Sequence, residues 1–286
     1  MGSENVSAQN HLRGSYSLLA SCPNELGPGL IRAGFWNYLR EDITVALMKK
    51  RMLIIELNER PPPLELDGED DFANHITYIL GRIINCCLHK DGTALNRQEW
   101  ESLKEELQSW KLSLPASFEP IFTPRLYGES RFPSVWNTSK WHSMWQASIQ
   151  LFRQLTIPAS SLHYYHTAMV ILLLAEPISP ATNTLQQIER MKSIEDKLEY
   201  HAVQVCALAI SSNAGPVWVN AFGPISFCWF CLESHCVAVL TRIGGPWLRQ
   251  FEMLTEIANE LTTWGGRTGW PVSNIVKSLE ESASRI

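Results

Sequence analysis

The sequence predicts an all-α protein of about eight to ten helices without a regular repeat. Apolar residues recur at intervals of three and four along most of the chain, which is the period of an amphipathic helix. Strand patterns are nearly absent, because no stretch alternates polar and apolar residues over more than a few positions. We therefore expect residues 1–10 to be a flexible lead and residues 11–286 to form a single all-helical domain.

Composition and charge argue against several classes of protein. The chain has 24 Lys and Arg against 29 Asp and Glu, a formal net charge of −5, so we expect no direct contact with nucleic acid. The compact basic cluster 49–51 is expected to sit near the C-terminal end of a helix. Seven cysteines and the absence of a signal-peptide pattern predict reduced thiols in the cytosol or nucleus. The apolar run 168–175 is far shorter than the roughly 20 residues of a membrane span, so no membrane contact is expected.

The first half of the chain is expected to contain three helices. The first covers residues 31–47, and Asp70 and Asp71 are expected to cap the second, which Asp91-Gly92 ends. Asn96 and Glu99 resemble a capping box ahead of the third. The inward-facing residues should be Ile31, Phe35, Tyr38, Leu39, Ile43, Ala46 and Leu47, then Phe72, Ile76, Ile79, Leu80, Ile83 and Cys87, then Trp100, Leu103, Leu107 and Trp110.

The second half begins with a proline-rich segment at 114–136, whose aromatic residues are expected to dock it on helices as a packed wrap. Helical periodicity then resumes in three stretches, 140–155, 158–175 and 185–211. A last helix is expected from Pro246 to about Trp264, where Gly265-Gly266 would end it as a C-cap.

The segment CWFCLESHC at 228–236 raises the question of a metal site. Pro224 can begin a helix, which would place Cys228, Cys231 and His235 on one side. Residues 228 and 235 would then be about 10.5 Å apart along the axis, whereas zinc bonds are only about 2.0–2.3 Å long. A redox pair would need its first thiol at the start of the helix, and Cys228 lies a full turn inside. We therefore expect buried packing, with no metal and no cofactor.

The segment HYYH at 163–166 places two histidines one turn apart, where they could share a ligand or a proton. A third partner is missing, because Glu176 would lie about 15 Å from His166 along a helix. We expect helix-face histidines and no site. The sequence also lacks a Gly-rich phosphate loop, a Gly-x-Ser-x-Gly elbow and a His-Glu-x-x-His motif, so no catalytic residue is identified.

Eleven tryptophans are many for this length. Trp218, Trp229 and Trp247 could line a pocket for a flat or terpenoid-like ligand. Core and interhelical packing of large rings is the alternative, and we favour it.

Four segments resemble the fungal-specific transcription factor domain, the regulatory domain of binuclear zinc-cluster factors. They are HLRGSYSLLA at 11–20, FWNYLREDITVALMKKR at 35–51, HYYHTAMVILLLAEP at 163–177 and GGRTGWPVSNIVKSLEE at 265–281. The resemblance spans about residues 11–281, and FWNYLREDITVAL and TGWP are its most specific pieces. It implies an all-helical domain that contributes to activation control or dimer contacts and in some members responds to a small molecule.

The departure from the family concerns its DNA-reading module. Such factors carry an N-terminal cluster of six cysteines with interleaved basic residues, whereas Cys22 is the only cysteine here before Cys86. CWFCLESHC cannot replace that cluster, because its thiolates must converge from short loops. Three explanations stay open: a missing upstream part, a stand-alone regulatory domain that pairs with a full-length factor, or a domain recruited to small-molecule binding or conversion.

Together these observations predict a transcription regulatory protein of a fungal nucleus, with the cytoplasm as a second location, that serves a metabolic or secondary-metabolite pathway. Its partners would be a full-length zinc-cluster factor or a second copy, with a small hydrophobic effector as a further candidate. The alternative is a binding protein or pathway enzyme that uses the aromatic pocket.

Overall fold

A computed structural model describes residues 12–17, 29–57, 68–89, 95–118, 120–122, 136–137, 149–177, 184–211, 217–228, 246–269 and 272–284. The fold is all-α, as predicted. The elements are α2 (Leu30–Lys49), α3 (Glu69–Cys87), α4 (Arg97–Leu112), a 3-10 turn η1 (Ala116–Phe118), strands β1 (Pro120–Phe122) and β2 (Trp136–Asn137), α6 (Ile149–Leu174), α7 (Thr184–Ile210), α9 (Pro246–Thr268) and α10 (Ser273–Ser284). Residues 12–17 and 217–228 are also helical.

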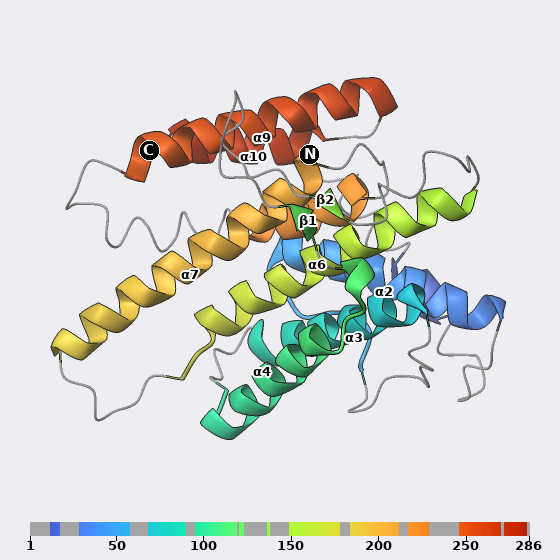
Figure 1. Ribbon diagram of the computed structural model, residues 1–286, viewed down its shortest axis with the longest axis horizontal. Helices are drawn as coiled ribbons and strands as arrows, with labels where there is room; N and C mark the ends of the chain where they lie inside the picture. The colour runs from blue at the N-terminus through green and yellow to red at the C-terminus, as the bar shows by residue number, and fades with distance from the viewer. Residues whose placement is uncertain are drawn as a thin grey trace.

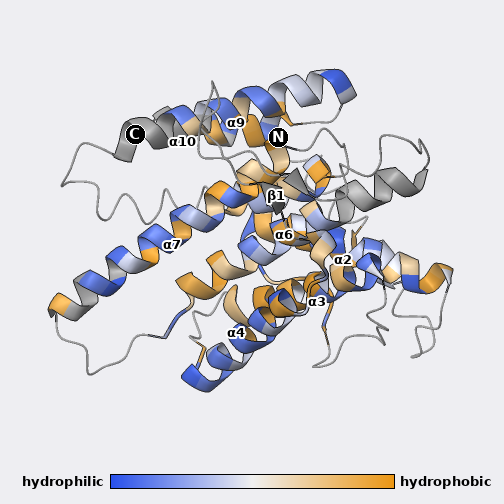
Figure 2. Ribbon diagram, viewed as in Figure 1, coloured by the Kyte–Doolittle hydropathy of each residue, from blue (hydrophilic) through white to orange (hydrophobic). Residues whose placement is uncertain are grey.

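The helices pack around α6, which contacts α3 on one side and α7 on the other (Figure 1). Helices α2 and α4 lie against α3, and α9 pairs with α10 at the opposite side of the molecule. Figure 2 shows apolar residues concentrated on α3 and the C-terminal half of α6, whereas α4, α7 and α9 carry hydrophilic residues on their outward sides. Buried residues from Leu12 to Leu279 belong to one hydrophobic cluster. No helix in the described part of the chain has the length and apolarity that a bilayer crossing requires.

Helix α2 follows its predicted pattern at most positions. Phe35, Tyr38, Leu39, Ile43, Ala46 and Leu47 are buried as expected. Ile31, in the first turn, is 46% exposed, which corrects the prediction that it faces inward. The helix ends at Lys49, and Lys50 adopts a left-handed conformation with its N–H directed to the carbonyls of Ala46 and Leu47. The basic cluster therefore does lie at a helix C-terminus, as predicted.

The ends of α3 differ from the prediction, whereas the start of α4 agrees with it. Gly68 is the N-cap of α3, so Asp70 and Asp71 lie in the first turn, where their charges still favour the helix dipole. The helix ends at Cys87, before the predicted stop at Asp91-Gly92. In α4 the capping box is confirmed: Asn96 Oδ1 accepts from the backbone N–H of Glu99 at 2.9 Å, and Glu99 Oε2 accepts from that of Asn96 at 3.2 Å.

Two prolines predicted to begin helices lie inside them. Helix α6 runs through Pro158, so the two helices predicted on either side are one. Residues 217–228 are helical through Gly223 and Pro224, so Pro224 does not begin that helix. Both prolines are buried, and the contacts of the surrounding helix outweigh the one backbone hydrogen bond that each proline removes. A Cβ on Gly223 would lie 2.9 Å from the Cα of Thr44, so glycine permits this close approach to α2.

The C-terminal helix α9 is longer than predicted. It passes through Gly265-Gly266 and ends at Thr268, and Gly269, with φ of 75°, takes the cap position. The Gly269 N–H donates to the Gly265 carbonyl at 2.8 Å. A glycine does end the helix, as predicted, but it is Gly269 and not Gly265 or Gly266.

The proline-rich segment is partly described. Phe118 is fully buried and its ring lies 6.0 Å from that of Phe72 on α3, so this part of the segment docks on a helix as predicted. Strands β1 and β2 form a short antiparallel ladder that the sequence did not predict. The remaining aromatic side chains, those of Phe122, Tyr127 and Phe132, lie outside the described residues, as do residues 1–10 and 140–148.

Candidate functional site

Of the three tryptophans expected to line an aromatic pocket, the structure describes the side chain of one, Trp218. Trp218 is 4% exposed, and its ring stacks on Trp264 of α9 with centroids 6.2 Å apart and planes at 25°. Phe222 meets the same Trp264 ring edge-on at 5.4 Å. Trp229 and the side chain of Trp247 lie outside the described residues. The described contacts of Trp218 are those of interhelical packing, and the pocket itself stays a prediction.

The cysteine-rich segment is likewise described only at its first residue. Cys228 is buried at the end of helix 217–228, as expected of a packing thiol. Residues 229–236 lie outside the described part of the chain. Among the residues that are described, no group of three or more His, Cys, Asp or Glu side chains is placed to hold a metal ion.

His201, on another helix, lies beside the HYYH segment, and the sequence did not predict this contact. His163 and His166 lie on α6, and Nδ1 of His166 is 2.8 Å from Nδ1 of His201 on α7. The two residues are 35 positions apart, so no local spacing rule connects them. Glu176, which we expected to lie too far from His166 to be its partner, forms ion pairs with Arg97 and Arg190.

The imidazole pair has the properties of a buried structural contact. One Nδ1 must donate and the other accept, so at least one ring is neutral. The ring of Tyr165 lies edge-on to His166 at 5.2 Å, and that of Tyr200 lies edge-on to His201 at 5.1 Å. Burial lowers the pKa of His201 to about 4, and burial together with the charges of His201 and Lys111 holds the pKa of His166 well below its usual value. Both rings are therefore neutral at pH 7 and hold α6 against α7.

His163 lies deeper in the same interface. It is fully buried, and neither ring nitrogen has a hydrogen bond of regular geometry. Desolvation lowers its pKa to about 3, and a weaker polar contact with the Val205 backbone opposes this shift. A neutral imidazole with an unpaired N–H costs on the order of 1–3 kcal/mol of stability.

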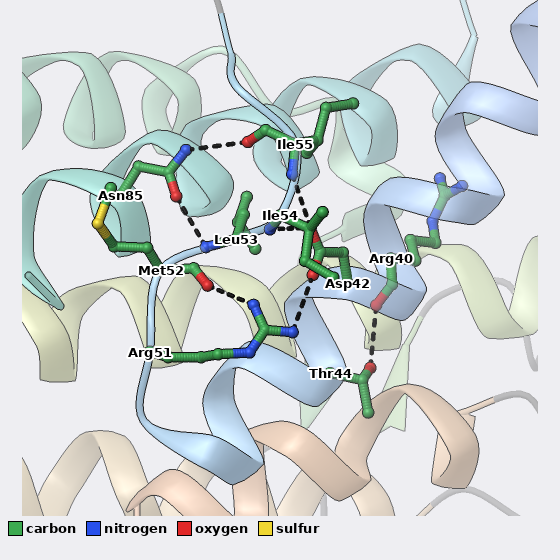
Figure 3. A network of polar contacts seen from close by, with 9 residues as sticks. All are labelled: Arg40, Asp42, Thr44, Arg51, Met52, Leu53, Ile54, Ile55 and Asn85. Carbon is green, nitrogen blue, oxygen red and sulfur yellow. Dashed lines mark hydrogen bonds and ion pairs between the residues drawn. The ribbon is translucent and has the colours of Figure 1, made fainter. Parts of the chain in front are cut away.

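The strongest polar network surrounds Asp42, a residue that the sequence analysis did not identify (Figure 3). Asp42 faces the core from α2 and is 0% exposed. Its carboxylate accepts from the backbone N–H groups of Ile54 at 2.6 Å and Ile55 at 3.1 Å. Arg51 completes the site at 3.4 Å from the carboxylate. Burial raises the pKa of Asp42, and these hydrogen bonds and the guanidinium oppose that shift.

Asn85 of α3 holds the other side of the same segment. Its Oδ1 accepts from the backbone N–H of Leu53 at 2.9 Å, and its Nδ2 donates to the carbonyl of Ile55 at 3.3 Å. Residues 51–55 are therefore tied to α2 and α3 at once, as Figure 3 shows. The network fixes the connection between the two helices. A list of apolar positions alone omits it, because Asp42 is a charged residue beside Ile43 on the buried face.

No family model, curated protein or solved structure was found to match this chain.

Proposed function

We propose that this chain is a transcription regulatory protein of a fungal nucleus that acts through protein contacts and serves a metabolic or secondary-metabolite pathway. The proposal rests on the resemblance of four segments to the regulatory domain of zinc-cluster factors. The all-helical fold agrees with that resemblance. The most specific of those segments, 35–47, lies wholly within α2 and presents a buried face to the rest of the domain.

The exposed residues on the outward side of α7 favour a protein partner. Exposed residues recur there at helical spacing over about 22 Å at 1.5 Å per residue. They are Leu185, Glu189, Lys192, Ser193, Asp196, Lys197 and Tyr200, which we call the outer face of α7. In Figure 1 the N-terminal half of this helix reaches the edge of the molecule.

The chemistry of the outer face of α7 suits protein more than nucleic acid. Leu185 is 73% exposed and Tyr200 is 56% exposed, so a large apolar side chain stands at each end. Between them two acidic and two basic residues cancel in charge. A face without net charge releases no counterions from a phosphate backbone, whereas exposed aromatic and aliphatic side chains beside mixed charges are typical of protein interfaces.

The partner in this proposal is a full-length zinc-cluster factor or a second copy of the chain. In the first case the basic module of the partner would hold the DNA. The chain alone, with a net charge of −5, should then bind duplex DNA more weakly than the roughly 10⁻⁴ to 10⁻⁶ M that non-specific binders reach.

A mobility-shift titration tests this proposal. The chain is expected to shift duplex DNA only when a full-length zinc-cluster factor is added, and sedimentation of the chain alone reports self-association. A variant with Leu185→Glu and Tyr200→Glu should abolish whichever association is found. Leu112→Glu on α4 is the control, because Leu112 is 87% exposed but lies on another helix. Salt-sensitive, sub-micromolar DNA binding by the chain alone would contradict the proposal, and so would equal effects of the two variants.

The alternative function, binding or conversion of a ligand in the aromatic pocket, has a separate test. A panel of hydrophobic metabolites should quench tryptophan fluorescence or raise the melting temperature if the pocket exists. A ligand at 100 times its Kd should add about 2.7 kcal/mol of stability. No described contact of Trp218 favours this function over packing.

A further inference from the structure

Arg40 on α2 has a positive charge without a carboxylate partner among the residues that the structure describes. Its Nη2 donates to Oδ1 of Asn74 on α3 at 2.6 Å. A guanidinium has five N–H donors, so most of them are left for other acceptors. Burial lowers the pKa of Arg40, and the charges of Tyr164 and Asp70 oppose that shift. Figure 3 shows the guanidinium of Arg40 directed away from the Asp42–Arg51 pair.

Polar side chains from two further helices lie near this cation. The hydroxyl of Tyr164 on α6 donates to Oδ1 of Asn220 at 3.4 Å, and Nδ2 of Asn220 donates to Oγ of Ser160 at 3.3 Å. Tyr164 is close enough to Arg40 for the guanidinium to act on the pKa of its hydroxyl. The close approach of Gly223 to Thr44 brings helix 217–228, which carries Asn220, against α2.

Arg40 and Asn74 form one hydrogen-bonded pair, and Tyr164, Asn220 and Ser160 form a hydrogen-bonded chain on the neighbouring helices. We call these five residues, which belong to four helices, the Arg40 cluster. Tyr164 is 2% exposed, whereas the other four are half-buried and keep part of their surface in solvent. The bonds at 3.3 and 3.4 Å are at the long end of the hydrogen-bond range, so an incoming acceptor can replace them at little cost.

The chemistry of the Arg40 cluster selects among anions. A planar guanidinium matches the two oxygens of a carboxylate and pairs with it through two parallel hydrogen bonds. Burial raises the pKa of Tyr164 to about 12, so its hydroxyl is a donor at neutral pH. One cation with neutral hydroxyl and amide donors balances a single negative charge, whereas a phosphate dianion would be left under-neutralised.

We propose that the Arg40 cluster is a binding site for the carboxylate group of a small organic acid. The acid would pair with the guanidinium of Arg40 and accept from Tyr164 and an amide of the cluster. The site would link α2, α3, α6 and helix 217–228 through one ligand. This inference does not depend on the regulatory function, because binding is measured without any readout of transcription.

Calorimetric titration of the full chain with paired probes tests the proposal. The probes are acetate, benzoate, phenylacetate and succinate, each with its neutral amide, and inorganic phosphate, all at constant ionic strength. At least one carboxylate should bind in the millimolar range or better while its amide does not. Arg40→Gln should weaken that binding by about tenfold or more. Arg32→Gln is the matched control, because Arg32 lies on the same helix and pairs with Asp71 at 3.6 Å.

Tyr164→Phe provides a second test that keeps the buried ring. It should weaken carboxylate binding by about threefold to tenfold, the contribution of one hydrogen bond, and it remains decisive if Arg40→Gln does not fold. The proposal fails if no carboxylate binds, if the amides bind equally well, or if Arg32→Gln and Arg40→Gln have the same effect. Tighter binding of inorganic phosphate than of every carboxylate would overturn the assignment of the ligand class.

Discussion

Replacement of Asp42 by asparagine is the sharpest test of the network that joins α2 to α3. The carboxylate accepts from two backbone N–H groups and from Arg51, and it has no exposed surface. Asparagine has the same shape, but it offers one acceptor oxygen and an NH₂ group in place of the second oxygen. Both backbone N–H groups donate to Oδ2 and Arg51 donates to Oδ1, so the single asparagine oxygen can serve only one of these two sides. Arg51, whose side chain is 17% exposed, also loses its counter-charge.

The expected loss follows from these contacts. An unsatisfied buried donor costs about 1–3 kcal/mol, and breaking a buried ion pair by removing one partner costs about 3–5 kcal/mol. A neutral asparagine avoids the cost of burying a charge, the same cost that raises the pKa of Asp42, and this offsets part of the lost stability. We expect Asp42→Asn to lower the free energy of unfolding by about 2–4 kcal/mol, and the melting temperature by about 3–7 °C for a chain of this size.

Urea unfolding followed by circular dichroism measures this effect. Glu41→Gln is the control, because it removes a neighbouring charge from the exposed side of the same helix. The control should change the free energy of unfolding by less than about 0.5 kcal/mol. If Asp42→Asn behaves like Glu41→Gln, the network does not hold the segment 51–55, and the reasoning from Figure 3 is refuted.

Three further results are expected. Gly223→Ala should lower the free energy of unfolding by about 1–3 kcal/mol in urea unfolding, because the new Cβ would lie 2.9 Å from the backbone of α2. Gly34→Ala is the control: its Cβ would have no atom within 4 Å, so the free energy of unfolding should rise by up to about 1 kcal/mol. Because burial lowers the pKa of His163, His166 and His201 in the folded state, the unfolded chain binds more protons below about pH 6.5. Stability should therefore fall by about 2 kcal/mol per histidine between pH 7 and pH 5, and His201→Gln should reduce this dependence; an unchanged slope would contradict the burial of the pair. A chelator should leave the melting temperature unchanged, because we expect no structural metal. Stoichiometric zinc that is lost together with the fold would contradict this.

The sequence predicts the helices of this fold because each buries an apolar stripe of period 3.6, as Trp100, Leu103, Leu107 and Trp110 do on α4. It fails where local rules and tertiary burial conflict. Pro158 and Pro224 predicted breaks, but both prolines are buried and the helix is continuous through each of them. The start of α3 is at Gly68, in an extended conformation, and the end of α9 is at Gly269, in a left-handed one, so these two ends move by a few residues from the predicted positions.

The candidate sites are less predictable, since their residues converge from distant segments. Asp42 and Ile54 are 12 positions apart, His166 and His201 are 35 apart, and Tyr164 and Asn220 are 56 apart. Local spacing cannot reveal such pairs. The sequence does carry one usable signal, a charged residue at position 42 on a stripe that is otherwise apolar, because a buried charge must be paired or hydrogen-bonded.

The segment FWNYLREDITVAL carries the resemblance to a regulatory domain, and the structure gives two of its charges different tasks. Asp42 is fully buried and its acceptors are occupied by Ile54, Ile55 and Arg51, so it serves the fold. Arg40, two residues earlier, points to another side of α2, keeps unused donors and is half-buried. In our proposal a carboxylate ligand pairs with Arg40, and the helix that fixes the core through Asp42 would then also link that ligand to Asn74 of α3.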